Sequence, residues 1–236
     1  MTRSLFSTTN NRPPTQYRGR FAPSPSGLLH FGSLIAALAS YLDAKKNKGL
    51  WLVRIEDIDP PREQKGASDN ILKTLEAFGL HWDESVLYQS QQADLYYDVL
   101  NDLSNQSLSY YCRCTRADIK KTGGIYQGHC RPLVHQNNNT ATRVINHHPV
   151  SFYTDLVQGY VHCNLKLAQE DFTLVRKDGL FAYQLAVVVD DIAQNISHVI
   201  RGCDLLEPTA RQLSLFAILN THKPKYGHVP LAINES

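Results

Sequence analysis

The residues best suited to chemistry lie close to the N-terminus, at 20–33. They read Arg20-Phe-Ala-Pro-Ser-Pro-Ser-Gly27, followed by His30-Phe-Gly-Ser33 and then by an apolar helical pattern. This order predicts a strand, a turn stiffened by prolines, and a His-x-Gly at the start of a helix. Such an arrangement brings backbone N–H groups and an imidazole to one point, where they can hold an anionic phosphate. The segment therefore indicates nucleotide chemistry.

Charged residues also end two other predicted strands. Glu56 follows the strand expected at 50–55, and Arg201 ends the strand expected at 198–201. In a doubly wound fold, ligands bind at the carboxyl ends of the strands. The three segments that directly follow predicted strands are 22–30, 56–62 and 202–207. We therefore expect them to border a single cleft.

The elements that must position these residues follow from the hydrophobic pattern. A strand at 17–22, a helix at 33–48 and a strand at 50–55 form a βαβ unit, whose natural sheet is parallel. Further helices are predicted at 67–78, 91–103 and 209–219, and an apolar run fills 181–189. We predict an α/β fold built on a parallel sheet.

The pattern changes at 109–171, where short strands, many polar residues and a polar loop at 136–140 predict a small inserted domain. The chain then divides into four parts. We predict a disordered polar tail at 1–16, the first half of a nucleotide-binding domain at 17–108, the insertion at 109–171, and the second half of the domain at 172–236.

Three cysteines of the insertion offer thiolates at short spacing: Cys112, Cys114 and Cys130. Zinc normally takes four ligands, so one further ligand is needed. His129 is the chemically obvious choice, and Tyr126 and His135 are alternatives. Three or four protein ligands leave no obvious open position, and we therefore expect a structural zinc ion that stiffens the insertion.

Composition limits the other possibilities. The chain has 236 residues, 42% of them hydrophobic and 19% charged, which predicts a real core. No apolar run approaches the roughly 18 residues that a membrane span needs. The net charge of +2 decides little about nucleic-acid binding. Five cysteines, an odd number, do not suggest a disulfide framework. We expect a cytoplasmic monomer with reduced thiols.

The nucleotide-binding segment resembles the first signature of the class I glutamyl-tRNA synthetases. Three further stretches resemble other segments of that catalytic domain: Arg54-Ile-Glu-Asp-Ile-Asp59, Tyr183 followed by Val187-Val-Val-Asp-Asp191, and His198-Val-Ile-Arg-Gly-x-Asp204. The similarity extends over 17–236. It implies a Rossmann-like class I aminoacyl-tRNA synthetase catalytic domain that activates glutamate with ATP.

Several details are more similar to a short paralogous family, the glutamyl-queuosine tRNA(Asp) synthetases. They are Asp57-Ile-Asp-Pro-Pro-Arg62, Gly123-Gly-Ile-Tyr-Gln-Gly-His-Cys130, Gly179-Leu-Phe-Ala-Tyr-Gln184 and Asp204-Leu-Leu-Glu-Pro-Thr-Ala-Arg211. This resemblance implies that ATP, L-glutamate and tRNA(Asp) carrying queuosine are the partners. It also implies a tyrosine as the fourth zinc ligand. The expected metal set is then Cys112, Cys114, Tyr126 and Cys130.

The chemistry of activation suggests a role for each charged residue. The two carboxylates of glutamate suit Arg20 and Arg201, because a planar guanidinium binds carboxylates in a bidentate manner. Which arginine takes the side-chain carboxylate stays open. Glu56 suits the ammonium group, and Ser24 and Tyr183 can supply neutral hydrogen bonds.

The phosphates of ATP are expected to lie at the start of the helix. His30 and Gly32 are the predicted catalytic residues, because the imidazole can donate to phosphate oxygens and the glycine lets the nucleotide approach the backbone. Ser33 completes the predicted nucleotide site. The predicted glutamate site comprises Arg20, Phe21, Ala22, Pro23, Ser24, Glu56, Tyr183 and Arg201. Magnesium is expected with ATP, held mainly by phosphates and water.

Four acidic residues receive a structural interpretation. Asp57 and Asp59 are as well explained by surface ion pairs at a strand end as by chemistry. Asp190 and Asp191 are interpreted as helix-capping residues.

Three other functions are weighed. One is a catalytic fragment of an ordinary glutamyl-tRNA synthetase, against which the stretch 123–130 argues. A second is a small nucleotidylyltransferase, which would not need Glu56, Arg201 and the insertion together. The third is a non-catalytic, zinc-stiffened RNA-binding module. Class I enzymes carry a lysine-rich loop that closes on the ATP phosphates. That loop is expected to begin where this chain stops, at 231–236, so no residue here is given its role.

Overall fold

The centre of the molecule is a five-stranded sheet with the order β10-β9-β1-β2-β3, in which each recorded strand pair is parallel. The computed structural model describes residues 14–232, and nearly all of the tail predicted at 1–16 lies outside that range. The strands are β1 (Arg18–Phe21), β2 (Leu50–Ile55), β3 (Leu87–Tyr88), β9 (His198–Gly202) and β10 (Lys225–Val229). The predicted α/β class with a parallel sheet is confirmed.

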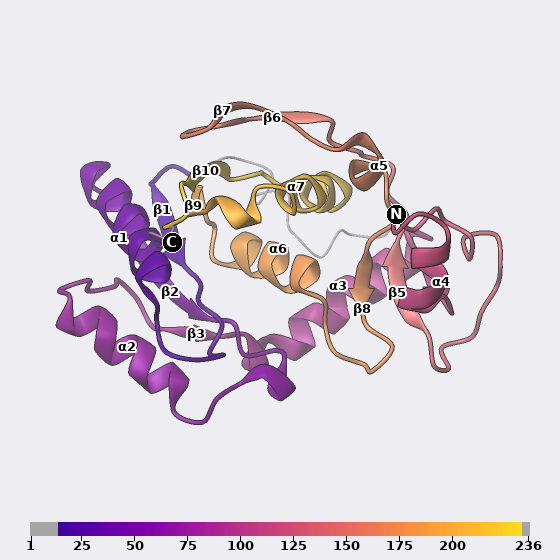
Figure 1. The fold of residues 1–236 in the computed structure, drawn as a ribbon, viewed down its shortest axis with the longest axis horizontal. Coiled ribbons are helices and arrows are strands. Elements are labelled where there is room, and N and C mark those ends of the chain that lie inside the picture. The colour runs from indigo at the N-terminus through magenta and orange to yellow at the C-terminus, as the bar shows by residue number, and fades with distance from the viewer. Residues whose placement is uncertain (1–13, 233–236) are drawn as a thin grey trace.

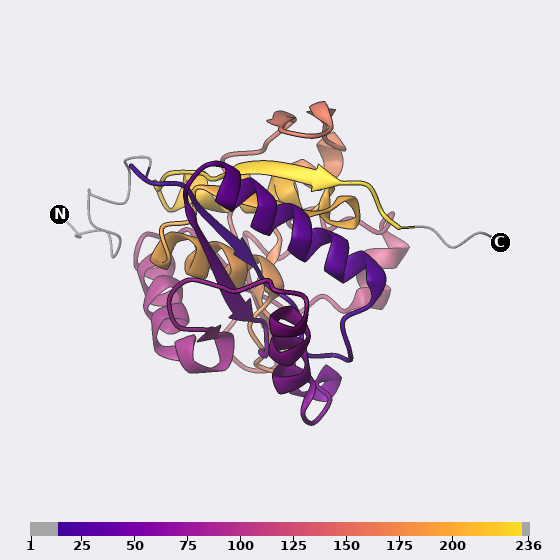
Figure 2. The ribbon, with the colours of Figure 1, turned by 90° about the vertical axis from the view of Figure 1, so that its left-hand side faces the viewer.

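Helices cover both faces of this sheet (Figure 1). On one side lie α1 (Phe31–Lys46) and α2 (Ala67–Ala77); on the other lie α3 (Ala93–Asn105), α6 (Tyr183–Ala193) and α7 (Thr209–Ile218). In Figure 2, α1 crosses the strands on the face of the sheet that it shares with α2. The four predicted helices correspond to α1, α2, α3 and α7, with ends that shift by a few residues. No helix in the described part of the chain is both long and apolar enough to span a bilayer.

The side chains of β2 point alternately to the two faces of the sheet, and the two sets make different contacts. Trp51, Val53 and Ile55 are buried in the cluster formed with α1 and α2. Because successive side chains of a strand point to opposite faces, Arg54 turns toward α6 instead. The same alternation in β1 turns Arg20 toward α6 and leaves Phe21 in the cluster with Trp51. Two arginines thus enter the interface between the sheet and α6.

Two neighbouring aspartates of α6 meet these arginines. Asp190 and Asp191 lie inside the helix and are buried. Arg54 Nη2 lies 2.6 Å from Asp191 Oδ1, and Arg54 Nε lies 3.8 Å from Asp190 Oδ2. The interpretation of both aspartates as capping residues is therefore wrong. The α6 helix begins at Tyr183, and the aspartates, more than one turn later, pair with cations from the sheet.

A three-stranded antiparallel sheet with the order β4-β5-β8 begins in the predicted insertion. Its strands are β4 (Ser109–Cys112), β5 (Ala141–Val144) and β8 (Thr173–Val175), and α4 (Arg116–Lys121) follows β4. The predicted insertion ends at residue 171, whereas β8 pairs with β5 beyond that residue. The sheet therefore continues into the segment that leads to α6.

A hairpin within the segment 109–171 lies over β10 and α7 (Figure 1). It consists of β6 (Phe152–Asp155) and β7 (Gly159–His162), and α5 (Leu165–Ala168) follows it. Tyr153 is buried against Val199, Leu213 and Tyr226. The insertion is thus anchored on the main domain by an apolar contact.

Replacing Arg54 by methionine should destabilise the fold strongly. The change keeps an apolar stem and leaves Asp190 and Asp191 without the guanidinium that contacts both. Removing one partner of a buried ion pair costs about 3–5 kcal/mol. The measurement is the free energy of unfolding from urea titrations. In the control Lys45→Met, at a pair with Asp83 that is only partly buried, a loss below about 1 kcal/mol is expected. Equal losses in the two variants would contradict a central role for Arg54.

Candidate active site and metal centre

A cavity of about 980 Å³ opens at the carboxyl ends of the parallel strands. It is bordered by the segments that follow β1, β2, β9 and β10. The predicted glutamate and nucleotide residues all line it: Arg20, Phe21, Ala22, Pro23, Ser24, His30, Gly32, Ser33, Glu56, Tyr183 and Arg201. The structure thus brings together residues that are far apart in the sequence, and the expected single cleft is present.

His30 caps the N-terminus of α1 at the edge of this cavity. Its Nδ1 accepts a hydrogen bond from the Ser33 backbone N–H at 3.2 Å, and the Ser33 hydroxyl lies 3.0 Å from Nε2. The imidazole folds over Gly32, where an added Cβ would lie 3.2 Å from ring atoms of His30. An exposed imidazole and the first N–H groups of the helix therefore face the same space, as an anion site requires.

Arg20 is held from behind by α6. It is buried, and its Nε and Nη2 lie 3.3 Å and 3.4 Å from the two carboxylate oxygens of Asp191. Burial alone would raise the pKa of Asp191, but the adjacent charges of Arg20 and Arg54 lower it. Asp191 therefore remains an anion that fixes the position of Arg20.

Asp190 is held in a different way. Its carboxylate accepts hydrogen bonds from Gln89 Nε2 at 2.7 Å and from the Tyr96 hydroxyl at 2.9 Å. Burial raises the pKa of Asp190, although Arg54 opposes that shift. These contacts connect α3 and the segment after β3 to α6. The sequence patterns gave no indication of Gln89 or Tyr96.

Glu56 is a carboxylate of the cavity that has an unsatisfied oxygen atom. Its Oε1 is buried and has no hydrogen-bond partner. Burial raises the pKa of Glu56 to about 7, even though Arg54 and Arg20 act in the opposite direction. A carboxylate in this state gains most from a cationic group that enters the cavity, because such a group supplies both charge and hydrogen bonds.

Arg201 is fixed by a network on its far side. Its Nε donates to His228 Nε2 at 3.0 Å, and its Nη2 donates to Thr209 Oγ1 at 2.7 Å and to Gln212 Oε1 at 2.8 Å. Its Nη1 lies 3.3 Å from the Tyr183 hydroxyl, which also lines the cavity. Each guanidinium nitrogen thus has a protein partner, and the partner of Nη1 is a residue that lines the cavity.

His228 links Arg201 to the hairpin of the insertion. His228 Nδ1 lies 2.6 Å from Asp155 Oδ2, and both side chains are fully buried. Burial and the charge of Arg201 lower the pKa of His228. The neutral ring then donates from Nδ1 to Asp155 and accepts at Nε2 from Arg201. Neither residue was predicted, because no local pattern connects them.

The remaining acidic residues near the strand end have structural contacts. Asp57 accepts hydrogen bonds from the backbone N–H and the hydroxyl of Ser90, at 2.8 Å and 2.6 Å. Asp59 pairs with Arg176 at 3.3 Å. The contact of Asp59 is a surface ion pair, as the structural alternative expects, whereas Asp57 accepts hydrogen bonds from Ser90 instead of forming an ion pair.

The three cysteines of the insertion form a compact cluster. The Sγ atoms of Cys112, Cys114 and Cys130 all lie within 4.8 Å of one another, and no imidazole nitrogen of the described residues joins this group. The Cys114 and Cys130 sulfurs are 3.6 Å apart. Two thiolates on a tetrahedral zinc ion lie about 3.8 Å apart, given Zn–S bonds of about 2.3 Å. The cluster is therefore close enough to hold one metal ion.

Tyr126 is a buried candidate for a fourth ligand. It is buried with the cysteines, and its hydroxyl oxygen accepts a hydrogen bond from the Cys130 backbone N–H at 2.9 Å. Arg143 lies over its ring, with 3.8 Å from the guanidinium carbon to the centroid. His129 is exposed.

Comparison with known families identifies the class of this fold. A family model described as tRNA synthetases class I (E and Q), catalytic domain, matches residues 16–236. The chain belongs to this family. The resemblance noted in the sequence is thereby confirmed.

Similar proteins and structures refine this result. A protein from Colwellia psychrerythraea named glutamyl-Q tRNA(Asp) synthetase is 65% identical over 229 residues, covering 92% of this chain and 73% of that protein. A protein of the same name from Escherichia coli K12 is 59% identical, covering 93% of this chain and 71% of that protein. The structure of a glutamate tRNA ligase from Elizabethkingia meningosepticum, in complex with its amino acid, matches with a TM-score of 0.81 and 27% identity. That match covers 92% of this chain and 49% of the ligase, so the chain spans about half its length.

The pKa of Glu56 predicts a pH dependence of stability. Between pH 4.5 and about 7, the folded protein retains a proton on Glu56 that the unfolded chain has released. The free energy of unfolding therefore decreases as the pH rises through this interval. Glu56→Gln removes the effect, so we expect the wild type to lose about 1–3 kcal/mol relative to this variant between pH 5 and 7.5. Urea titrations at both pH values measure it, with the exposed Glu76→Gln as control. Parallel pH profiles for wild type and Glu56→Gln would contradict the shift.

Proposed function

We propose that this chain activates L-glutamate with ATP as glutamyl-adenylate and transfers the glutamyl group to queuosine in the anticodon of tRNA(Asp). One observation carries the proposal: identities of 65% and 59%, over more than nine-tenths of the chain, to proteins named glutamyl-Q tRNA(Asp) synthetase. The charges in the cavity support the amino-acid part of it.

In the activation step, an α-carboxylate oxygen of glutamate attacks the α-phosphorus of ATP. A bond forms between that oxygen and phosphorus, the bond from phosphorus to the bridging oxygen breaks, and pyrophosphate leaves with the electron pair. The protein contributes by aligning the reactants and by stabilising charge on the phosphorus. His30 and the first N–H groups of α1 are suited to the phosphate oxygens, and Gly32 keeps the backbone accessible. Magnesium, carried by the phosphates, would supply further charge neutralisation.

The amino acid is proposed to lie between two arginines and one carboxylate. Glu56 receives the ammonium group, and Arg20 and Arg201 receive the carboxylates. The contacts of Arg20 with Asp191 and of Arg201 with His228 support this assignment, because they hold both guanidinium groups in place before the substrate arrives. Ser24 and Tyr183 supply neutral hydrogen bonds from the cavity wall.

In the transfer step, a hydroxyl oxygen of the acceptor attacks the carbonyl carbon of the adenylate. An ester bond forms, the bond between that carbon and the phosphate oxygen breaks, and AMP leaves with the electron pair. The hydroxyl proton passes to the released phosphate or to water.

The acceptor assay tests the proposal directly. Full-length protein is incubated with ATP, labelled glutamate and one of three RNAs: tRNA(Asp) with queuosine, the same tRNA with guanosine in its place, or tRNA(Glu). We expect label on the queuosine-containing tRNA alone, together with glutamate-dependent exchange of pyrophosphate into ATP. Arg201→Met should abolish both reactions, because the guanidinium is proposed to bind substrate.

Other outcomes favour the alternative functions. Label on tRNA(Glu) indicates an ordinary glutamyl-tRNA synthetase. Label on no RNA, without pyrophosphate exchange, indicates the non-catalytic RNA-binding module. Pyrophosphate exchange at wild-type rate in Arg201→Met would remove that residue from the site.

Zinc is proposed as the metal of the cysteine cluster, with Cys112, Cys114, Cys130 and Tyr126 as its ligands. The thiolate donors favour zinc over magnesium or calcium, and the sulfur spacing fits a tetrahedral ion. When bound, the ion would cross-link β4 to the loop at 126–130. Its role is then structural, because four protein ligands leave no position for a substrate.

Metal content separates the two candidates for the fourth ligand. We expect about one zinc per purified wild-type chain, and none in Cys114→Ser. Tyr126→Phe should lose zinc to a competing chelator faster than the wild type, whereas His129→Gln should lose it at the wild-type rate. Elemental analysis during chelator titration measures this, with the midpoint of thermal unfolding as a second readout. Rapid loss from His129→Gln alone would make His129 the ligand, and no zinc in the wild type would overturn the proposal.

A further inference from the structure

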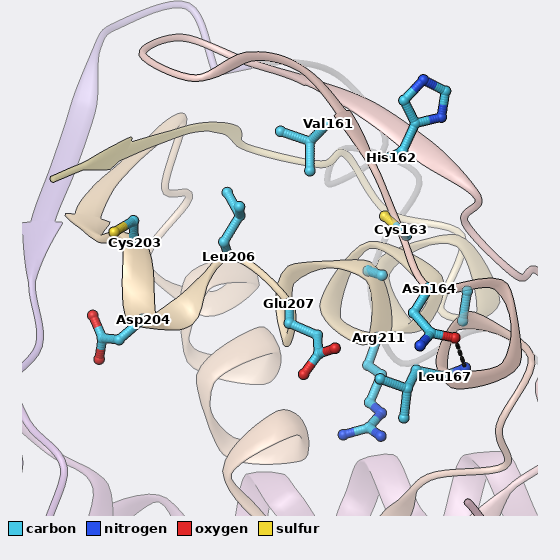
Figure 3. A pocket seen from close by; sticks show the side chains of 12 residues that line it. Val161, His162, Cys163, Asn164, Leu167, Cys203, Asp204, Leu206, Glu207 and Arg211 are labelled. Atoms are coloured by element: carbon cyan, nitrogen blue, oxygen red, sulfur yellow. Dashed lines mark hydrogen bonds between the residues drawn. The ribbon is translucent and has the colours of Figure 1, made fainter. Parts of the chain in front are cut away.

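Two smaller cavities share lining residues with the proposed active site. One, of about 430 Å³, is drawn in Figure 3 between the segments 161–168 and 203–211. Its carboxylates, Asp204 and Glu207, are exposed, and water satisfies exposed carboxylates. This cavity therefore does not indicate a ligand. The other, of about 310 Å³, is lined by residues that have buried oxygen atoms without hydrogen-bond partners.

The cavity of about 310 Å³, the side cavity, adjoins the active-site cavity. It is bordered by residues of 56–63, which follow β2, and by residues of 176–183, which lead into α6. Ser24, Glu56 and Tyr183 line both spaces. The proposed function places these three side chains around the amino acid. The side cavity is therefore next to the position proposed for glutamate.

The register of the sheet brings Gln89 beside Glu56. Ile55 pairs with Tyr88 in the parallel register of β2 and β3, and the next residues along the two segments are Glu56 and Gln89. Glu56 lies two residues after Arg54 and so points to the same face of the sheet, which α6 covers. Gln89 donates a hydrogen bond to α6 on that face. Because neighbouring strands are about 4.8 Å apart, the two side chains lie side by side at the carboxyl edge of the sheet.

The amide of Gln89 is fixed in one orientation. Its Nε2 donates to Asp190 Oδ2 at 2.7 Å, and that carboxylate lies beside the Arg54 guanidinium, so it takes the amide nitrogen and not the amide oxygen. Oε1 is left without a hydrogen-bond partner among the described residues, although Gln89 exposes only 1% of its surface. A buried acceptor in this state costs free energy until a donor reaches it. Gln89 thus offers one unsatisfied oxygen to the cavity that it lines.

The unsatisfied oxygens limit which ligand can bind between them. Glu56 Oε1 and Gln89 Oε1 are both acceptors, and one of them belongs to a carboxylate. Two adjacent acceptors suit a cation with several N–H donors, whereas a carboxylate or a phosphate would be repelled. The arginines that line the side cavity do not fill this role: Arg176 pairs with Asp59, and Arg62 is exposed.

We propose that Gln89 binds the ammonium group of L-glutamate together with Glu56. This inference rests on the proposed function, which places that ammonium group at Glu56. An ammonium group has three N–H donors, so a bond to Glu56 leaves donors for Gln89 Oε1. Asp190, which lines neither cavity, is then a positioning residue, because it holds the amide with its oxygen toward the substrate.

The test compares two ligands that differ only in the ammonium group. L-Glutamate carries it, whereas glutarate has the same two carboxylates and a hydrogen atom in its place. Calorimetric titration of the full-length protein without ATP gives the dissociation constant of each ligand. In Gln89→Met, which keeps the length of the side chain but removes the oxygen, the affinity for glutamate should fall about tenfold, because a hydrogen bond to a charged group is lost. The affinity for glutarate should stay at the wild-type value.

Two further variants separate contact with the substrate from support of Asp190. Tyr96→Phe removes the other neutral hydrogen bond to Asp190 and leaves Gln89 in place, so it should keep the wild-type preference for glutamate over glutarate. Gln89→Glu keeps an acceptor oxygen at the same position, and its preference for glutamate should equal or exceed that of the wild type. The midpoint of thermal unfolding shows whether each variant is folded, and Gln89→Glu carries the test if Gln89→Met is not.

The outcomes distinguish this inference from the proposed function. A wild-type preference for glutamate in Gln89→Met, or equal losses for glutamate and glutarate in that variant, overturns the inference while the proposed function stands. A reduced preference in Gln89→Glu or in Tyr96→Phe does the same. Absence of glutamate binding and of glutamate-dependent pyrophosphate exchange in the wild type defeats the proposed function itself.

Discussion

The buried ion pairs between the parallel sheet and α6 are the interaction on which the rest of the structure depends. Arg20 and Arg54 leave adjacent strands on the same face, and Asp191 contacts both. Burying such charges carries a large desolvation cost, which only good geometry and additional hydrogen bonds offset. Gln89 and Tyr96 supply such bonds to Asp190. The network therefore fixes the position of α6 against the sheet, and with it the place of Tyr183, at the first turn of α6, relative to Glu56, at the end of β2.

A second buried network ties the insertion to the same cavity. Asp155, from the hairpin, orients His228 on β10, and His228 accepts the Arg201 Nε–H. Because the His228 ring is fully buried and fixed on both nitrogens, Arg201 has little freedom before a substrate arrives. The hairpin is thus more than a peripheral feature of the insertion. Its attachment, through Tyr153 and Asp155, shapes one half of the proposed glutamate site.

The fold class and most of the candidate site could be predicted from the sequence, because the patterns that indicate them involve neighbouring residues. The βαβ pattern at 17–55 and the His-x-Gly at the start of α1 depend on neighbouring residues. The residues that the sequence patterns did not identify make contacts with residues that are distant in the sequence. Asp190 and Asp191 stand in an apolar run, where a charged residue suggests an end of the helix, but their arginine partners lie more than 130 residues away along the chain. His228 and Asp155 are likewise separated by 73 positions. Only the folded chain brings such groups together.

The two buried networks leave the residues of the proposed glutamate site in unequal states. Arg20 and Arg201 are held by Asp191 and His228 before a substrate arrives, whereas Glu56 has a buried carboxylate oxygen without a hydrogen-bond partner. Electrostatic preorganisation of this kind acts without motion at the moment of reaction. A cationic group that enters the cavity therefore completes the contacts of Glu56 while the two guanidinium groups stay in place.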